Sequence, residues 1–220
     1  MKNKLASALF IVALFLLILT VSIGLPIYVR PFFYAHIDAL ALPEQSGFTR
    51  EEIIEAYDEV LDYLTIPGKP FGTGVMPHSE EGASHFADCK ILFDLNGTVL
   101  ILSFVSIFIL LVLRKKNKIK LLGFGRFSAG ICSALAATLI PLILGGLAAI
   151  DFDRAFDIFH AIFFPGKVNF IFYPDEDPII RILPVTFFRN CGILICAGIL
   201  TFSLSIIIAE WIRLRRKCKH

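Results

Sequence analysis

Two histidines carry the strongest signal for chemistry in this sequence. His85 is followed three residues later by Asp88, and His160 is preceded at helical spacing by Asp153 and Asp157. Residues three or four apart share one face of a helix, so each imidazole has a carboxylate within reach. An imidazole exchanges a proton near neutral pH, and a neighbouring carboxylate can select its tautomer. We therefore expect acid/base chemistry at the two histidines, with the carboxylates in supporting roles.

Plainer interpretations stay open for the same side chains. Both histidines adjoin apolar runs, so they can be interfacial residues whose polar tips reach water. Asp153 and Asp157 can be ordinary surface charges of a helix. Asp94, a further candidate deeper in an apolar region, can bridge helices instead of serving a site. The sequence contains no nucleophile elbow, zinc helix or phosphate loop, so acyl-transfer chemistry would need an uncommon arrangement.

The elements that must hold these residues are long and apolar. Of 220 residues, 56% are hydrophobic and 18% are charged, which is too apolar for an ordinary soluble domain. A membrane-spanning helix needs about 20 apolar residues because the hydrocarbon core is roughly 30 Å thick. Four apolar runs are long enough, namely 5–25, 91–113, 127–150 and 191–211. The first of these runs is interpreted as a retained span and not as a cleaved signal peptide.

The distribution of charge predicts the orientation of these spans. Thirteen of the 21 Lys and Arg residues lie in three short stretches without Asp or Glu, at 2–4, 114–126 and 213–219. Segment 31–90 instead has eleven acidic and three basic residues. Because short cytoplasmic segments retain positive charge, both termini are expected in the cytoplasm and segment 31–90 outside. The basic stretches would face anionic lipid, which requires no nucleic-acid partner.

These features predict an all-α integral membrane protein with four transmembrane helices and a small extracellular cap. A capping box at Thr49 and Glu52 starts a cap helix, and the strand propensity of 168–173 adds short strands to the outer segments. A single helix is expected from about Ser84 to Leu113. The predicted organisation is transmembrane helix 1 in 1–30, the cap in 31–90, helix 2 in 91–113, a basic cytoplasmic loop in 114–126, helix 3 in 127–150, an outer amphipathic helix and loop in 151–190, and helix 4 with a cytoplasmic tail in 191–220.

The five cysteines do not form a disulfide framework. Cys132 and Cys196 fall within spans, and Cys218 falls in the cytoplasmic tail. Cys89 and Cys191 are therefore the only possible outer pair, and the spacing leaves open whether they are joined. The spacing identifies no metal site.

Several short motifs together resemble the lipoprotein intramolecular transacylases, a family of four-span bacterial membrane proteins. The resemblance covers most of the chain. One departure is Asn169-Phe170, near which the family pattern leads us to expect a Trp. The residues that carry the resemblance are the entry to the second span at 79–90, the Phe-His-x-Ile-Phe-Phe segment at 159–164, Tyr173-Pro174-x-x-Asp177, and Leu183-Pro184 before the fourth span.

This resemblance implies an enzyme at the outer face of the cytoplasmic membrane of Gram-positive bacteria. Its substrate would be a diacylglyceryl-modified lipoprotein in membrane lipid, and no metal or other cofactor would be needed. The sn-2 acyl chain would move to the α-amine of the same N-terminal Cys and give a lyso-form lipoprotein. The resemblance places paired catalytic histidines at His85 and His160, and we assign the base to His85. A non-enzymatic pH sensor and a structural partner protein are the alternatives.

Overall fold

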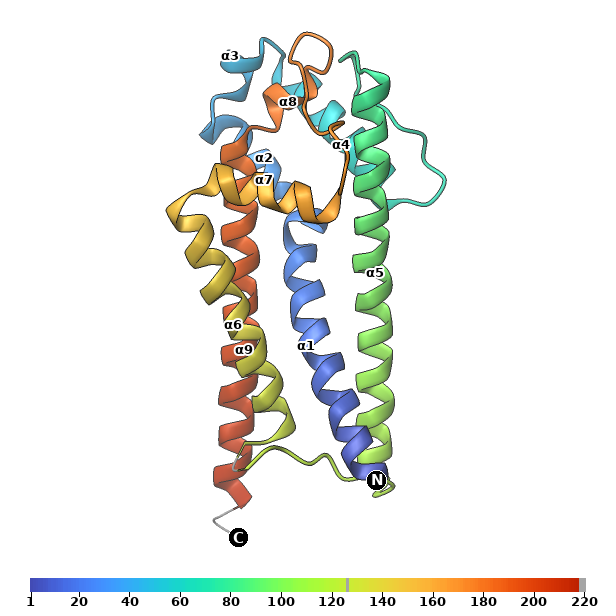
Figure 1. Ribbon diagram of the computed structural model, residues 1–220, viewed down its shortest axis with the longest axis vertical. Coiled ribbons are helices and arrows are strands. Elements are labelled where there is room, and N and C mark those ends of the chain that lie inside the picture. The colour runs from blue at the N-terminus through green and yellow to red at the C-terminus, as the bar shows by residue number, and fades with distance from the viewer. Residues whose placement is uncertain (126, 218–220) are drawn as a thin grey trace. The chain divides into compact units, whose positions relative to one another are not determined.

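The computed structural model describes residues 1–125 and 127–217, and the predictions that concern Arg126, Cys218 and His220 lie outside these residues. Within them the chain is helical, without strands (Figure 1). Four helices are long and apolar enough to cross a membrane. This confirms the predicted all-α membrane fold with four candidate spans. The four are α1 (Lys2–Tyr28), α5 (Glu80–Lys115), α6 (Ala129–Ile150) and α9 (Val185–Lys217).

The predicted short strands are wrong. Residues 168–173 form a turn followed by extended chain, and no ladder of backbone hydrogen bonds joins them to another segment of the described residues. Phe170 and Phe172 instead direct their rings against the histidines His85 and His160. The β-branched and aromatic residues of this segment thus have strand propensity, but contacts with neighbouring helices decide its conformation.

The chain forms two compact units. One comprises residues 1–25, 96–146 and the chain from 193 onward, and its helices pack through small and apolar side chains. Ile18, Ala137 and Ile199 form one buried cluster. A Cβ on Gly198 would lie 2.8 Å from a methyl carbon of Leu25, so glycine permits the close approach of α9 to α1. Such small residues are typical of helix contacts in membranes, where tight packing replaces the hydrophobic effect.

Polar side chains also join helices in this first unit. Asn96 Nδ2 donates a hydrogen bond to the Thr20 carbonyl at 3.3 Å, and the Ser133 hydroxyl donates to the Ile11 carbonyl at 3.1 Å. These contacts satisfy buried polar groups that lipid could not. The outward surfaces of the long helices keep large apolar side chains exposed, as expected for faces toward lipid, including Leu102, Phe104, Ile143, Leu144, Leu204 and Ile208.

The second unit comprises residues 26–95 and 147–192 and contains five shorter helices. Helices α2 (Arg30–Ala39), α3 (Leu42–Ser46) and α4 (Arg50–Thr65) contact one another, and α3 contacts α8 (Ile179–Ile182). The capping box predicted at Thr49 and Glu52 is confirmed at the start of α4. The Phe33 and Tyr57 rings stack with their centroids 3.7 Å apart, and this pair belongs to the buried face between α2 and α4.

Helix α7 (Phe152–Phe163) is amphipathic and follows the third candidate span, where we had expected an amphipathic helix. The Asp151 carboxylate accepts a hydrogen bond from the Arg154 backbone N–H and caps the helix N-terminus. The helix ends at Phe164, beyond which Gly166 adopts a left-handed conformation with φ of 75°. The chain then turns back, and residues 167–177 run beside the first turns of α5 within the second unit.

Candidate active site

His85 and His160 lie together in the second unit. His85 is on the second turn of α5 and His160 is near the end of α7, and each imidazole-bearing residue is only 6% exposed. Their ring centroids are 5.7 Å apart, with an interplanar angle of 30°. Helical spacing had selected each histidine separately, and the tertiary structure brings them within reach of one reacting group.

Aromatic rings enclose the two histidines. Phe170 stacks on His160 with the centroids 4.5 Å apart. The Phe164 and Phe172 rings meet His85 edge-on, with centroid distances of 5.1 and 5.5 Å. Because these rings exclude water, hydrogen bonds and charges at the histidines act in a medium of low dielectric constant and are stronger than in bulk solvent.

The hydrogen bonding of His160 defines its tautomer. Its Nδ1 lies 2.8 Å from the carbonyl oxygen of Phe156, one helical turn earlier. A carbonyl only accepts, so Nδ1 carries the proton and donates it. In a neutral imidazole the other nitrogen, Nε2, then has the free lone pair. Nε2 of His160 is thus the nitrogen that can accept a proton.

His85 has a different environment. Its Nε2 lies 3.4 Å from the Cys89 Sγ atom, one turn along the same helix, and a thiol is a weak hydrogen-bonding partner. The Nδ1 atom of His85 is buried and has no hydrogen-bond partner among the described residues. Such an unsatisfied buried atom costs about 1–3 kcal/mol, which indicates a position where a ligand or a change of protonation supplies the missing bond.

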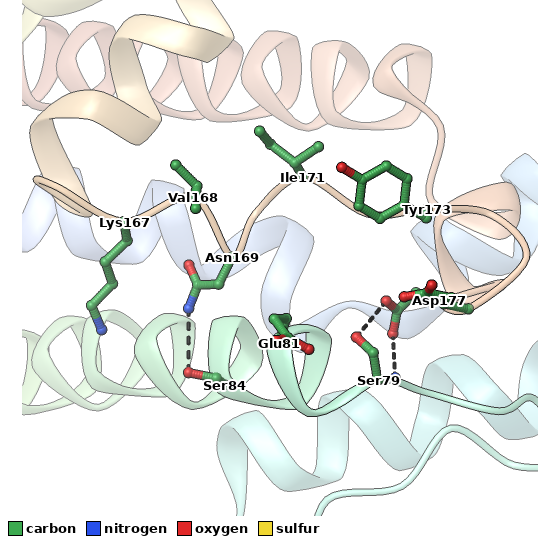
Figure 2. Close-up of a pocket in the computed structure, with 10 residues that line it drawn as sticks. Ser79, Glu81, Ser84, Lys167, Val168, Asn169, Ile171, Tyr173 and Asp177 are labelled. Atoms are coloured by element: carbon green, nitrogen blue, oxygen red, sulfur yellow. Dashed lines mark hydrogen bonds between the residues drawn. The ribbon is translucent and has the colours of Figure 1, made fainter.

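Asp88 is the carboxylate nearest to His85 along α5, but its partners come from another segment. It forms an ion pair with Lys167 and accepts a hydrogen bond from Asn169 Nδ2 at 3.0 Å. Asn169 Nδ2 also lies 3.3 Å from the Ser84 hydroxyl (Figure 2). Asp88 therefore joins the 167–169 segment to α5, and it bonds to an amide and an ammonium where we had expected an imidazole.

The other candidate carboxylates lie away from the histidines' polar atoms. Asp153 and Asp157 are exposed on α7, and neither forms a hydrogen bond or ion pair in the part of the chain that the structure describes. We had expected these two carboxylates to orient the His160 imidazole, but His160 Nδ1 donates its hydrogen bond to the Phe156 carbonyl instead. Asp94 is nine residues beyond His85, about 13 Å along α5, and pairs with Lys90 at 3.8 Å.

The remaining described histidines form hydrogen bonds outside this pair. His36 Nδ1 donates to the Phe32 carbonyl at 2.7 Å, and its Nε2 lies 3.0 Å from Asn190 Nδ2. His78 Nδ1 lies 3.1 Å from the Thr73 hydroxyl at an exposed position. Neither lies beside a second histidine, which agrees with their exclusion from the predicted pair.

A pocket of about 510 Å³ is lined by Ser84, the residue before His85, and by Asn169, but by neither histidine. It lies between the start of α5 and the 167–177 segment (Figure 2), and this volume is within the range of small-ligand sites. Asp177, at its far end, is 3% exposed and accepts hydrogen bonds from the Ser79 backbone N–H and hydroxyl at 2.8 and 2.6 Å. The lining residues include Ser79, Ser84, Lys167, Asn169, Tyr173 and Asp177.

Two features of the site were missed by sequence reasoning. The first is the link from Lys167 and Asn169 to Asp88, which joins segments about 80 residues apart and leaves no local pattern. From the sequence, Asn169 was noted only as a departure from a family pattern, and no contact was predicted for it. The second is the contact between Cys89 and His85. Cys89 and Cys191 are both free thiols, so the two are not joined by a disulfide. No cluster of three or more His, Cys, Asp or Glu side chains among the described residues could hold a metal ion.

Comparison with known proteins places this geometry in context. The family model of the lipoprotein intramolecular transacylase Lit matches residues 8–188. The in meso structure of Lit from Bacillus cereus is similar with a TM-score of 0.89 at 23% identity, covering 100% of this chain and 99% of that chain. A structure of the Bacillus cereus protein with an H85A mutation has a TM-score of 0.83 at 22% identity, covering 100% and 96%. No curated protein sequence matches the chain.

Proposed function

Because the chain belongs to the lipoprotein intramolecular transacylase family, we propose that it converts diacylglyceryl-modified lipoproteins to the lyso form. In this reaction the sn-2 acyl chain of the diacylglyceryl-cysteine moves to the α-amino group of the same N-terminal Cys. An ester C–O bond breaks and an amide C–N bond forms, so no oxidant, reductant or activated co-substrate is consumed.

The observation that carries this proposal is the buried pair His85 and His160 with centroids 5.7 Å apart. An O-to-N acyl transfer needs one group that removes a proton from the attacking amine and another that protonates the departing alkoxide. Two imidazoles held in different hydrogen-bonding states satisfy both needs. The family pattern also includes both positions, so spacing, geometry and family membership support the same two residues.

The tautomers suggest how the two roles are divided. His160 has its Nδ1 proton committed to the Phe156 carbonyl, which favours Nε2 as the base that takes a proton from the α-amine. His85 then stabilises the tetrahedral oxyanion and returns a proton to the sn-2 oxygen as it leaves. This assignment reverses our expectation that His85 is the base, which rested on sequence alone.

Placing donor and acceptor on one molecule assists the reaction. The α-amine and the sn-2 ester belong to the same modified cysteine, so the site only has to fold this headgroup into a reactive conformation. Such pre-orientation can contribute about 7–11 kcal/mol to lowering a barrier. The aromatic enclosure around His85 and His160 would exclude water, which would otherwise compete with the amine for the ester.

We also propose that the site faces the outside of a bacterial cytoplasmic membrane. The support is the charge distribution, with thirteen basic residues in three stretches on one side of the predicted spans and an acidic 31–90 segment on the other. A mature lipoprotein is exposed on that outer side, where its modified cysteine can reach the histidine pair.

Mass spectrometry of lipoprotein N-termini provides the test. Cells that express the protein in a strain lacking an endogenous transacylase should contain N-acylated, lyso-form lipoproteins. Cells with an empty vector should retain the diacylglyceryl form. If expression of correctly inserted protein leaves every sn-2 chain in place, the proposed reaction is wrong. A pH sensor or a structural partner would produce that result.

A further inference from the structure

We propose that Asn169 positions the imidazolium of His85 during acyl transfer, by accepting the His85 Nδ1–H at its side-chain oxygen. Asp88 then supports His85 through Asn169 and not by direct contact. The inference rests on the proposed function for its catalytic meaning, but its structural content can be measured without turnover. It assigns Asn169 as a positioning residue for His85.

The first observation is a pair of unsatisfied buried atoms. His85 Nδ1 and Asn169 Oδ1 are both buried and both lack a hydrogen-bond partner in the described residues. One is an acceptor, and the other becomes a donor when His85 binds a second proton. Leaving both unpaired is unfavourable, because each buried atom has lost its hydrogen bonds to water. A hydrogen bond between them in the protonated state would satisfy both atoms.

The second observation is that the Asn169 amide has a defined orientation. A carboxylate can only accept, so the amide nitrogen must face Asp88, at 3.0 Å. The same nitrogen lies 3.3 Å from the Ser84 hydroxyl, which leaves the amide oxygen on the opposite side (Figure 2). The ion pair of Asp88 with Lys167 holds this carboxylate in place. The oxygen is therefore the end of Asn169 that remains available to His85.

The third observation concerns the neighbours of Asn169. The next residue, Phe170, stacks on His160 with centroids 4.5 Å apart and lies 6.4 Å from the His85 ring. The 169–170 pair therefore reaches both histidines. No formed hydrogen bond joins Asn169 to His85 among the described residues, but Asn169 is one of the groups that oppose the lowering of the His85 pKa by burial.

The charged and titratable groups facing His85 come from three elements. Asp88 and Cys89 are on α5, His160 is on α7, and Lys167 is on the segment after α7. The Asp88 charge is compensated by its ion pair with Lys167. Burial and the neighbouring His160 lower the pKa of His85, whereas the Asp88 carboxylate and the neutral amide of Asn169 act in the opposite direction.

This arrangement assigns different tasks to the two His85 nitrogens. With Nδ1–H directed to Asn169, the proton on Nε2 faces only the Cys89 thiol at 3.4 Å. A thiol is a weak acceptor that a developing sn-2 alkoxide can readily displace. Nε2–H would therefore be the proton that stabilises and then neutralises the leaving oxygen, while Asn169 fixes the plane of the ring.

The test compares Asn169→Ala, Asn169→Asp and a matched control, Asn190→Ala. Asn190 is also an asparagine beside a histidine, but its amide nitrogen contacts His36 Nε2, and His36 lies outside the proposed site. Initial rates on a synthetic diacylglyceryl lipopeptide in detergent are measured across pH, alongside thermal stability. Asn169→Ala should lower kcat by about 10-fold or more with little change in KM, because it misplaces a general acid. In this variant the descending, high-pH limb of the rate–pH profile should move to lower pH.

Asn169→Asp provides the discriminating result. A carboxylate at this position keeps an acceptor and adds negative charge, so the descending limb should move to higher pH, opposite to the alanine variant. General damage to the fold cannot produce opposite shifts. Asn190→Ala should leave the profile unchanged. If both Asn169 variants shift the limb in one direction, or neither shifts it, the inference is overturned.

A second readout separates this inference from the proposed function. Histidine NMR titration of the labelled, detergent-solubilised protein reports the protonation of His85 directly, with His85→Gln used to assign its signal. The titration midpoint should fall in Asn169→Ala and rise in Asn169→Asp. If wild type carries out no transacylation but these midpoint shifts occur, the proposed function fails and the Asn169–His85 contact stands. An unchanged midpoint in a folded variant overturns the contact, whatever the activity.

Discussion

His85 and His160 lie with their ring centroids 5.7 Å apart, although 75 residues separate them in the sequence. Neither ring bonds to the other. His160 uses one nitrogen to hold a backbone carbonyl, whereas His85 leaves one nitrogen without a partner among the described residues. The two imidazoles therefore differ in protonation chemistry, as expected of a general base and a general acid.

Replacing either histidine should remove most lyso-lipoprotein formation without unfolding the protein. His85→Ala and His160→Ala each delete one proton-transfer group, for an expected loss of about 10²- to 10⁴-fold in rate. The double variant should be much less than additively worse, because the two groups act in one reaction. Rates per folded protein are measured on a diacylglyceryl lipopeptide. His36→Ala and His78→Ala are the controls. Near-normal turnover by folded His160→Ala would disprove the paired-histidine mechanism.

The α7 carboxylates should contribute little to the rate. Asp153→Asn and Asp157→Asn remove exposed charges, and the Phe156 carbonyl still holds His160 Nδ1, so activity should stay within about twofold of wild type. Asp88→Ala should instead reduce activity strongly, because it releases both Lys167 and Asn169. The comparison uses the same lipopeptide assay. A large loss in Asp157→Asn would restore the orienting role first expected from helical spacing.

Gly82→Ala should disturb the segment that borders the site. The added Cβ would lie 2.3 Å from Asp177 Oδ1 and 3.1 Å from the Phe172 ring, and Asp177 is buried with two hydrogen bonds to Ser79. Overpacking of this kind costs about 1–3 kcal/mol. Thermal unfolding in detergent should show the loss. The matched variant Gly192→Ala has nothing within 4 Å of its new methyl group and should unfold at or above the wild-type temperature.

The Arg30–Asp62 contact should make the second unit sensitive to acid. The hydrogen bond from Arg30 holds the pKa of Asp62 below its ordinary value. A lowered folded-state pKa contributes stability above the unfolded pKa of about 4, and this contribution disappears as pH falls through the folded value. Asp62→Asn should therefore lose about 1 kcal/mol at pH 7 and less at pH 3. Unfolding midpoints at both pH values measure the difference.

Glu55→Gln is the control for this acid effect. Glu55 is exposed on the same helix α4 and forms no ion pair in the described residues, so its replacement should change stability equally little at both pH values. If Asp62→Asn has the same deficit at pH 3 as at pH 7, the contact stabilises the fold through packing and not through charge.

Tag accessibility tests the proposed orientation. Tags at residue 1 and at Asn117 should be protected from impermeant reagents in intact cells, whereas a tag near Gly47 should react. The reason is the retention of basic segments in the cytoplasm. Gly47 is a suitable insertion point because it is exposed, with φ of 81°, and a Cβ there would meet nothing within 4 Å. External labelling at Asn117 would overturn the orientation.

The sequence by itself determined the features that depend on local periodicity and on lipid thickness. Four apolar runs predicted four long helices, because a backbone in lipid must satisfy its hydrogen bonds within the segment. The capping box at Thr49 and Glu52 was equally local, since four consecutive residues contain the whole pattern. The choice of His85 and His160 needed helical spacing and a family resemblance.

Only the tertiary structure decided how these pieces act together. The distance between the histidines depends on how α5 and α7 pack, which no local pattern records. Residues 168–173 have strand propensity but fold as a turn and extended chain, because Asn169 bonds to Asp88 and Phe170 stacks on His160. The free oxygen of Asn169 likewise follows from the Asp88 carboxylate, which can only accept and therefore turns the amide nitrogen toward itself.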